Sequence, residues 1–175
     1  MRYSWNIINQ KIKTCDELEI IVKQWKFKNK KVVFTNGCFD ILHYGHIRYL
    51  AKAKDEGDFL VVALNSSESI SRLKGKHRPI NDDLTRTYIM ASLDFVDAVV
   101  VFNNDTPYEL IDKIKPNLLV KGGDWKTHQI VGSDIVNKLG GVVKSLPFVK
   151  GYSTTGIEEK IKTEAIKQFR KNNKY

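Results

Sequence analysis

The sequence predicts an α/β fold, a Rossmann-like doubly wound sheet of about five parallel strands with helices on both faces. Short β-branched runs alternate with helical stretches along the chain, which is the pattern of βαβ units. The runs are short and almost wholly apolar, as expected for strands that are covered on both faces. Glycine and polar residues cluster after the runs, at the edge of an open sheet where ligands bind.

Each expected element follows from a local pattern. Thr14 and Glu17 form a capping box before apolar residues at helical spacing, so residues 15–28 are expected to form a leading helix. Gly57 ends one later helix, and Pro107 lies at the first turn of another. The expected strands are 31–35, 59–64, 97–102, 118–121 and 142–146, and the expected helices between and after them are 46–56, 82–94, 107–115, 130–139 and 154–169.

The length of the chain bounds its organisation. At 175 residues a single domain is expected, with a leading helix in residues 1–29, a core in residues 30–162 and a basic helical tail in residues 163–175. The apolar runs are too short to cross a bilayer, and the N-terminal residues have no signal-peptide pattern. We therefore expect a cytoplasmic protein without a membrane partner. Cys15 and Cys38 are expected to be reduced thiols, because two distant cysteines make no disulfide framework.

The positive charge lies at the two ends of the chain. The formal net charge is +9; residues 1–31 hold eight Lys or Arg against three acids, residues 150–175 hold seven against three, and residues 32–149 hold fourteen of each. A nucleic-acid groove needs a basic stripe with interleaved aromatic side chains, which this balanced middle does not offer. We expect small anionic substrates and no nucleic acid.

The segment His43-Tyr44-Gly45-His46 is the strongest functional signal. It lies between a predicted strand and a predicted helix, where two imidazoles and the N–H groups of a helix start can face one anion. Gly45 lets the backbone come close to that anion. A zinc pair and two surface histidines are the alternatives, but no further cluster of metal ligands is apparent near them in the sequence, so no protein-held metal is expected. We predict a phosphate site.

Polar segments also follow four of the predicted strands. They are Asn36-Gly37-Cys38-Phe39-Asp40, Asn65-Ser66-Ser67, Lys121-Gly122-Gly123-Asp124 with Trp125, and Gly151-Tyr152-Ser153-Thr154-Thr155. Because the carboxyl ends of parallel strands share one edge of the sheet, these segments are expected to line one crevice. The paired glycines are equally compatible with a plain turn, and the hydroxyl residues with a helix cap that also binds phosphate.

A basic segment runs from Ser71 to Pro79. It is either a solvated loop or a mobile lid that brings Lys74, Lys76 or Arg78 over phosphates. Arg86, on the helix that follows, is either a substrate ligand or an exposed helical arginine. Phe39 and Trp125 are candidates for stacking on a base, with core packing as the alternative for Phe39.

Taken in order, these segments resemble the cytidylyltransferase-like nucleotidyltransferase family over about residues 30 to 162. The phrases that carry the resemblance are Asn36-Gly37-Cys38-Phe39-Asp40-Ile41-Leu42-His43-Tyr44-Gly45-His46, Leu73-Lys74-Gly75 with Arg78-Pro79, Val120-Lys121-Gly122-Gly123-Asp124, and Ser153-Thr154-Thr155. The second and third phrases are most similar to the branch of the family that acts on D-glycero-β-D-manno-heptose 1-phosphate.

The resemblance implies transfer of AMP from ATP to that sugar 1-phosphate, giving ADP-heptose and pyrophosphate for lipopolysaccharide or another surface glycan. The alternative is a cytidylyltransferase acting on glycerol 3-phosphate or a related alcohol phosphate. Such relatives have an arginine-led phrase before Ser-Thr-Thr, where this chain has Phe148-Val149-Lys150-Gly151. A nucleotide-binding or nucleic-acid-associated module without turnover is the alternative outside the enzymes. Many relatives carry the activity behind a sugar-kinase domain, so a stand-alone transferase is expected here.

The resemblance also implies a role for each site residue. His43, His46 and Lys74 are expected to be catalytic. The residues expected to bind the nucleotide are Asn36, Gly37, Cys38, Phe39, Asp40, Gly45, Lys121, Gly122, Asp124, Ser153, Thr154 and Thr155. Asn65, Arg78 and Arg86 are expected to bind the sugar phosphate. Mg²⁺ is expected with ATP, held mainly by the phosphates. ATP and a sugar phosphate are the expected partners, with a second copy of the chain as the candidate protein partner.

Overall fold

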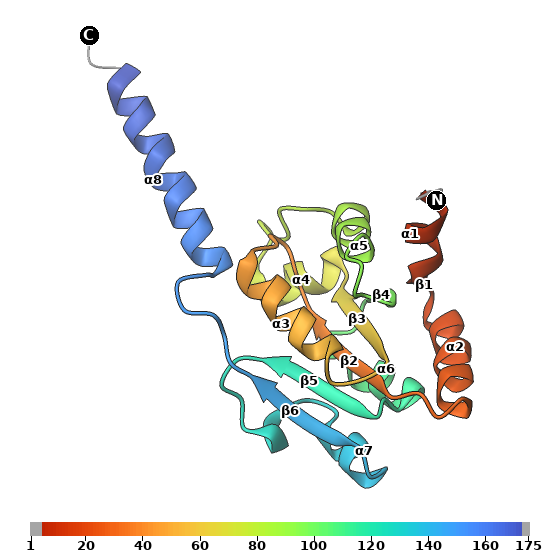
Figure 1. The fold of residues 1–175 in the computed structure, drawn as a ribbon. Coiled ribbons are helices and arrows are strands. Elements are labelled where there is room, and N and C mark those ends of the chain that lie inside the picture. Colours follow the sequence, from red (N-terminus) through yellow and green to blue (C-terminus); the bar gives the residue numbers. More distant parts are fainter. Residues whose placement is uncertain (1–4, 173–175) are drawn as a thin grey trace.

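The computed structural model describes residues 5–172, which form one six-stranded parallel sheet flanked by helices (Figure 1). The strands are β1 (Ile12–Lys13), β2 (Val32–Gly37), β3 (Phe59–Asn65), β4 (Ala98–Phe102), β5 (Leu118–Gly122) and β6 (Val142–Leu146). Their order is β1-β4-β3-β2-β5-β6. The chain runs outward from β2 to β3 and β4, then returns to place β5 on the other side of β2. The strand order therefore reverses between β2 and β5, where an open α/β sheet forms its ligand crevice.

The predicted α/β class with a parallel sheet is confirmed, but the sheet has one strand more than expected. The additional strand is β1, which pairs with β4 through Ile12 opposite Val99 and Lys13 opposite Val100. Two residues are too few to show a period of two in the sequence, so only the tertiary pairing reveals this strand. The segment expected to hold a single leading helix accordingly contributes an edge strand to the sheet.

The helices are α1 (Trp5–Lys11), α2 (Cys15–Phe27), α3 (Tyr44–Lys54), α4 (Ser67–Lys74), α5 (Asp83–Ala91), α6 (Tyr108–Ile114), α7 (Ser133–Lys138) and α8 (Thr154–Asn172), with a short 3₁₀ turn, η1, at Thr127–Gln129. Neither α1 nor α4 was predicted. The helix α4 takes in the first part of the segment 71–79, which the sequence indicated as a loop. Its N-cap is Ser66, whose side chain accepts a hydrogen bond from the Ser69 N–H, but its eight residues include only two apolar ones, Ile70 and Leu73, which is too short a pattern to indicate a helix.

Helices cover both faces of the sheet, as predicted. One buried cluster joins the sheet to α2, α6 and α7 through side chains such as Leu18, Ile111 and Val136. The other joins it to α3 and α5 through side chains such as Leu50 and Met90. The first three residues of β2 alternate between the two clusters, Val32 and Phe34 in the first and Val33 in the second, which is why the strand begins with an unbroken apolar run.

The predicted capping box of α2 is present. Thr14 accepts a hydrogen bond from the Glu17 N–H, and the Glu17 carboxylate accepts one from the Thr14 N–H at 2.8 Å. Leu18 and Val22 are fully buried on the face of α2 that packs toward the sheet. The cap fixes where α2 begins, and the apolar pair fixes which side faces the core.

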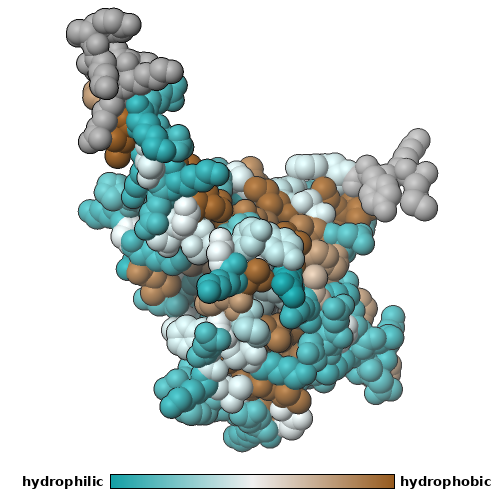
Figure 2. Space-filling view, turned by 60° about the vertical axis from the view of Figure 1, so that its left-hand side comes forward, coloured by the Kyte–Doolittle hydropathy of each residue, from teal (hydrophilic) through white to brown (hydrophobic). Residues whose placement is uncertain are grey.

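The last helix, α8, extends away from the layered body, and only its beginning lies near the sheet (Figure 1). Both hydrophilic and hydrophobic side chains reach its surface, at the upper left of Figure 2. Ile161, Ile166 and Phe169 are among its exposed apolar side chains. The expected basic tail at 163–175 is helical as far as Asn172, and its last three residues lie outside the described residues. None of the described helices is long and apolar enough to cross a membrane.

Candidate active site

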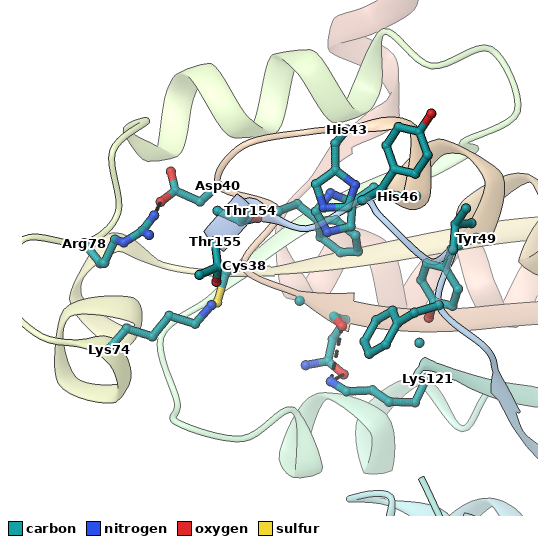
Figure 3. Close-up of a pocket in the computed structure, with 18 residues that line it drawn as sticks. Cys38, Asp40, His43, His46, Tyr49, Lys74, Arg78, Lys121, Thr154 and Thr155 are labelled. Atoms are coloured by element: carbon teal, nitrogen blue, oxygen red, sulfur yellow. Dashed lines mark hydrogen bonds and ion pairs between the residues drawn. The ribbon is translucent and has the colours of Figure 1, made fainter. Parts of the chain in front are cut away.

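A cavity of about 430 Å³ lies at the carboxyl ends of β2 and β5, beside the N-termini of α3 and α8 (Figure 3). It is lined by Asn36, Gly37, Cys38, Phe39, Asp40, His43, Gly45, His46, Tyr49, Lys74, Arg78, Lys121, Gly122, Phe148, Val149, Tyr152, Thr154 and Thr155. These residues come from four separate parts of the sequence, namely 36–49, 74–78, 121–122 and 148–155. The reversal of strand order is what brings them together.

The two histidines lie one against the other at the start of α3. The rings of His43 and His46 are stacked with centroids 3.8 Å apart, and the edge of the Phe39 ring meets His46 at 5.2 Å. Within the described part of the chain, the Nδ1 atoms of both imidazoles are buried and lack a hydrogen-bond partner. Unsatisfied buried nitrogens are costly, and they are typical of a site that binds a polar ligand.

Two glycines make this arrangement possible. A Cβ at Gly37 would lie 2.9 Å from the Phe39 ring, and one at Gly45 would lie 3.0 Å from His43 Nδ1. Phe39 itself adopts a left-handed backbone with φ of 43° and is buried. The loop between β2 and α3 therefore folds back tightly enough for Phe39 to pack beside His46. Phe39 lines the cavity and belongs to the core at the same time.

Burial depresses the pKa of both histidines. It is the main cause that lowers the pKa of His46 to about 4, and the neighbouring charge of His43 acts in the same direction. The pKa of His43 is also lowered by burial. Near neutral pH both imidazoles are therefore uncharged when the site is empty. A bound phosphate would favour the protonated forms and raise both pKa values.

These shifts predict an acid-sensitive fold. His46 titrates near its ordinary pKa of 6.5 when unfolded and near 4 when folded, so the unfolded chain takes up the proton first. The free energy of unfolding should therefore be highest above pH 6.5 and fall as pH drops toward 4. Allowing for solvent screening, we expect His46 to contribute about 1–2 kcal/mol to this loss. Urea denaturation near neutral and mildly acidic pH should show a weaker pH dependence for His46→Asn, and an unchanged dependence would contradict this cause.

Two lysines bring positive charge to the cavity from opposite sides. Lys121, at the end of β5, donates from Nζ to Asn36 Oδ1 at 3.2 Å, and burial lowers its pKa. Lys74, the last residue of α4, points into the cavity from the other side (Figure 3). Asp40 is the only acid among the described residues that line this cavity. The site therefore has an excess of positive charge that suits a phosphorylated ligand.

The start of α8 completes the cavity. Thr154 and Thr155 line it together with the histidines, although more than a hundred residues separate them in the sequence. Tyr152 packs near the start of α3, with its ring centroid 4.9 Å from that of Tyr44. Ser153 has a different role, since its Oγ accepts a hydrogen bond from the Gly156 N–H at 3.0 Å and it is not among the lining residues. Two of the three predicted hydroxyl residues thus face the cavity and the third caps the helix.

A second cavity of about 480 Å³ adjoins the first. The two cavities share Asn36, Gly37, Cys38, Lys74, Lys121, Gly122 and Phe148. The second is also lined by Asn65, Leu73, Asp105, Thr106, Pro107, Trp125, Gln129, Ile130 and Val131. Lys74 and Lys121 lie on the boundary between the two spaces. The arrangement offers room for two ligands whose charged groups meet at these lysines.

The structure places some predicted residues away from the first cavity. Asn65 is buried, donates to Ser69 Oγ at 3.0 Å and lines the second cavity only. Asp124 is exposed and lines neither cavity. The side chain of Arg86 is fully buried, and its Nη1 donates to the Cys38 carbonyl at 2.8 Å. Arg86 therefore supports the loop that carries the site, and its placement does not favour direct contact with a sugar phosphate.

Three lining residues lie outside the predicted segments, namely Tyr49, Phe148 and Val149. Tyr49 lies one helical turn after His46, which is the spacing that could have indicated it. Its hydroxyl pairs with the Thr35 hydroxyl and donates to the Val120 carbonyl at 3.1 Å. Burial raises the pKa of Tyr49, so it stays protonated and joins β2 to β5 beneath the site. Tyr152 lies in a segment that was predicted to line the crevice, but the sequence assigned no role to its side chain.

Comparison with known proteins identifies the class. Residues 34–169 match the family described as Cytidylyltransferase-like. The chain therefore belongs to the cytidylyltransferase-like family, and the predicted class of enzyme, a nucleotidyltransferase, is confirmed.

Curated relatives and solved structures agree with this class. The chain is 52% identical over 158 residues to the bifunctional protein HldE of Geotalea uraniireducens, covering 90% of this chain and 32% of that protein. It is 57% identical over 152 residues to HldE of Campylobacter concisus, covering 87% and 31%. The chain thus spans about a third of the length of these relatives. A lipopolysaccharide core biosynthesis protein from Thermoplasma volcanium is 32% identical, with a TM-score of 0.55, over 71% of this chain and 99% of that one.

A pantoate-beta-alanine ligase from Francisella tularensis shares the fold with a TM-score of 0.56 at 20% identity, over 84% of this chain and 75% of that one. At this identity the likeness concerns the architecture alone.

Proposed function

We propose that the protein transfers AMP from ATP to D-glycero-β-D-manno-heptose 1-phosphate, releasing pyrophosphate and forming ADP-heptose for a surface glycan. The observation that carries the proposal is the single cavity where the histidine pair, Lys74, Lys121 and the start of α8 converge. The similarity to HldE proteins and to a lipopolysaccharide core biosynthesis protein supports the choice of product.

The proposed donor, ATP, occupies the first cavity. His43 and His46 hold the triphosphate at the start of α3, and Thr154 and Thr155 hold its outer phosphates at the start of α8, where helix N–H groups favour anions. The residues at the ends of β2 and β5, including Gly122, lie against the nucleoside. The phosphates thus lie at the starts of two helices, and the nucleoside lies at the ends of two strands.

The proposed acceptor, the sugar phosphate, occupies the second cavity. Asn65, Asp105 and Gln129 offer polar groups to its hydroxyls, and Trp125 and Ile130 offer apolar surface. Lys74 and Lys121 line both cavities, so the acceptor phosphate meets the donor phosphates beside them. This geometry supports direct transfer between the two bound molecules.

In the proposed reaction, an oxygen of the sugar 1-phosphate forms a bond to the α-phosphorus of ATP. The bond from that phosphorus to the bridging oxygen of the β-phosphate breaks, and pyrophosphate leaves with the electron pair. No side chain needs to act as a nucleophile. His46 and the lysines donate hydrogen bonds and charge to the phosphoryl oxygens, where charge accumulates in the transition state.

Magnesium is part of the proposal as a companion of ATP. No three His, Cys, Asp or Glu residues group as metal ligands in the part of the chain that the structure describes. Asp40, which lines the cavity, already accepts hydrogen bonds from Arg78, Ile80 and Asn81. These residues fit an ion carried by the phosphates with the Thr154 and Thr155 hydroxyls nearby. When bound, Mg²⁺ supplies charge neutralisation of the triphosphate.

A substrate panel tests the proposal. Pyrophosphate release should be fastest with ATP and heptose 1-phosphate, and much slower when CTP replaces ATP or glycerol 3-phosphate replaces the sugar. Turnover with CTP and glycerol 3-phosphate instead would establish the alternative cytidylyl transfer. Salt-sensitive binding to a generic duplex without any pyrophosphate release would contradict both enzymes.

The proposed function also indicates where the reaction takes place and how the chain is organised. Because the donor is ATP, we place the reaction in the cytoplasm. We propose that the chain forms one nucleotidyltransferase domain with a core over 30–162.

A homodimer is the proposed assembly, because Ile161, Ile166 and Phe169 leave apolar surface exposed on α8. Light scattering of the purified protein would decide between one copy and two.

A further inference from the structure

Three segments of the chain meet at the side chain of Arg78. Its Nη1 donates to Asp40 Oδ2 at 2.8 Å, and its Nη2 pairs with Glu158 Oε1 (the Asp40 pair is drawn in Figure 3). The side chains of Arg78, Asp40 and Glu158 are only 22%, 6% and 20% exposed. They belong to the loop after α4, the loop after β2 and the start of α8. All three segments carry residues that line the first cavity.

The side chains of Arg78, Asp40 and Glu158 form a junction between the three segments, and Asp40 fixes one side of it. Its carboxylate accepts hydrogen bonds from the N–H groups of Ile80 and Asn81 at 2.9 Å, and its carbonyl accepts one from the Asn81 side chain. Burial acts to raise the pKa of Asp40, but these N–H groups and the Arg78 guanidinium outweigh it and hold the pKa below its ordinary value. The Asp40 charge is therefore stable, and the loop that follows Lys74 is anchored to the loop that precedes the histidines.

Glu158 is the contact through which α8 joins this junction. It lies four residues after Thr154, so both side chains are on the same face of the helix. Thr154 lines the cavity, Glu158 pairs with Arg78, and most of the helix beyond them is exposed. Before α8 begins, the packing of Tyr152 on Tyr44 is a second contact with the body. Few contacts therefore decide where Thr154 and Thr155 lie.

We propose that Arg78 and Glu158 are positioning residues that hold the start of α8 closed over the triphosphate. The inference rests on the proposed function of the first cavity. The Arg78 guanidinium is occupied by two carboxylates, so Arg78 acts through Glu158 and Asp40 instead of binding the sugar phosphate directly. The ion pair couples the segment that carries Lys74 to the helix that carries Thr154 and Thr155. Loss of the pair frees α8 to move away from bound nucleotide.

Amide hydrogen exchange without any substrate tests the position of α8. In Glu158→Ala, the amides of Gly156 and Ile157, which bond to Ser153, should exchange about tenfold faster, because loss of a charged hydrogen bond favours local opening. Glu159→Ala is the matched control, since its carboxylate is one residue away and exposed. Equal exchange in the two variants would overturn the inference. The melting temperatures of both variants should stay close to that of the native protein.

Nucleotide binding and turnover provide the second readout. Glu158→Ala should raise the KM for ATP and the Kd for a non-hydrolysable ATP analogue by about tenfold, while kcat and the KM for the sugar phosphate are largely retained. Glu158→Asp should recover part of the affinity, and Glu159→Ala should bind as the native protein does. A fall in kcat with unchanged ATP affinity would refute the positioning role. If the native protein lacks turnover but the exchange difference is present, the proposed function fails while the contact stands.

Discussion

Replacing His46 with alanine is expected to lower kcat by about 10³-fold while the protein stays folded, because a donor placed at the reacting phosphate contributes mainly in the transition state. His46 lies in the first cavity, stacked on His43. Burial lowers its pKa, so its imidazole is a neutral hydrogen-bond donor in the empty site. Steady-state pyrophosphate release with saturating ATP and sugar phosphate measures the effect. The KM for ATP should change much less than kcat.

The matched control is His128→Ala. His128 is exposed in η1 and lines neither cavity, so its removal should leave kcat unchanged. Far-UV circular dichroism of both variants checks the fold. Near-normal turnover of His46→Ala would remove His46 from the proposed mechanism, and an equal loss in His128→Ala would indicate a general effect of imidazole removal.

Replacing Lys74 with alanine should reduce kcat/KM for both substrates by about 10²-fold or more, because its ammonium group compensates charge where the two sets of phosphates meet. Lys74 lines both cavities, and it is therefore expected to affect the donor and the acceptor together. Initial rates at varied ATP and at varied sugar phosphate separate the two contributions. A loss confined to one substrate would place Lys74 on that substrate alone.

Lys76→Ala supplies the comparison for Lys74. It removes the same charge two residues away, from a side chain that is exposed and lines neither cavity. We expect a small, salt-sensitive effect from Lys76, since an exposed charge acts only through the screened field. Equal losses in the two variants would mean that the general charge of the loop matters and that the position of Lys74 does not.

Local patterns predicted most of the elements. The strands at 59–64 and 142–146 are present within a residue, and the capping box at Thr14 begins α2 as expected. Short apolar runs and helix caps depend on residues that are neighbours in the sequence, so the elements that they predict are present in the folded structure. The strand β1 and the helix α4 were missed because two residues show no period and an eight-residue helix with only two apolar residues gives too short a pattern.

Some features of the site were likewise predicted from short motifs, and others depend on contacts between distant segments. Paired imidazoles beside Gly45 indicated a phosphate site from the sequence, and the structure brings them to one cavity with Thr154 and Thr155. The same kind of reasoning treated Arg78 and Arg86 alike, as basic residues near the site. Their partners differ: Arg86 holds the Cys38 carbonyl from a buried position, and Arg78 joins Asp40 to Glu158.

The amino-acid sequence by itself determined the parallel α/β class, the family and the histidine pair, because periodicity, caps and short motifs are properties of adjacent residues. Only the tertiary structure decided which charged side chains face a ligand and which are bound by other parts of the chain. That choice depends on contacts between segments distant in the sequence, such as Arg78 with Glu158, and on the order of the strands that brings β5 beside β2.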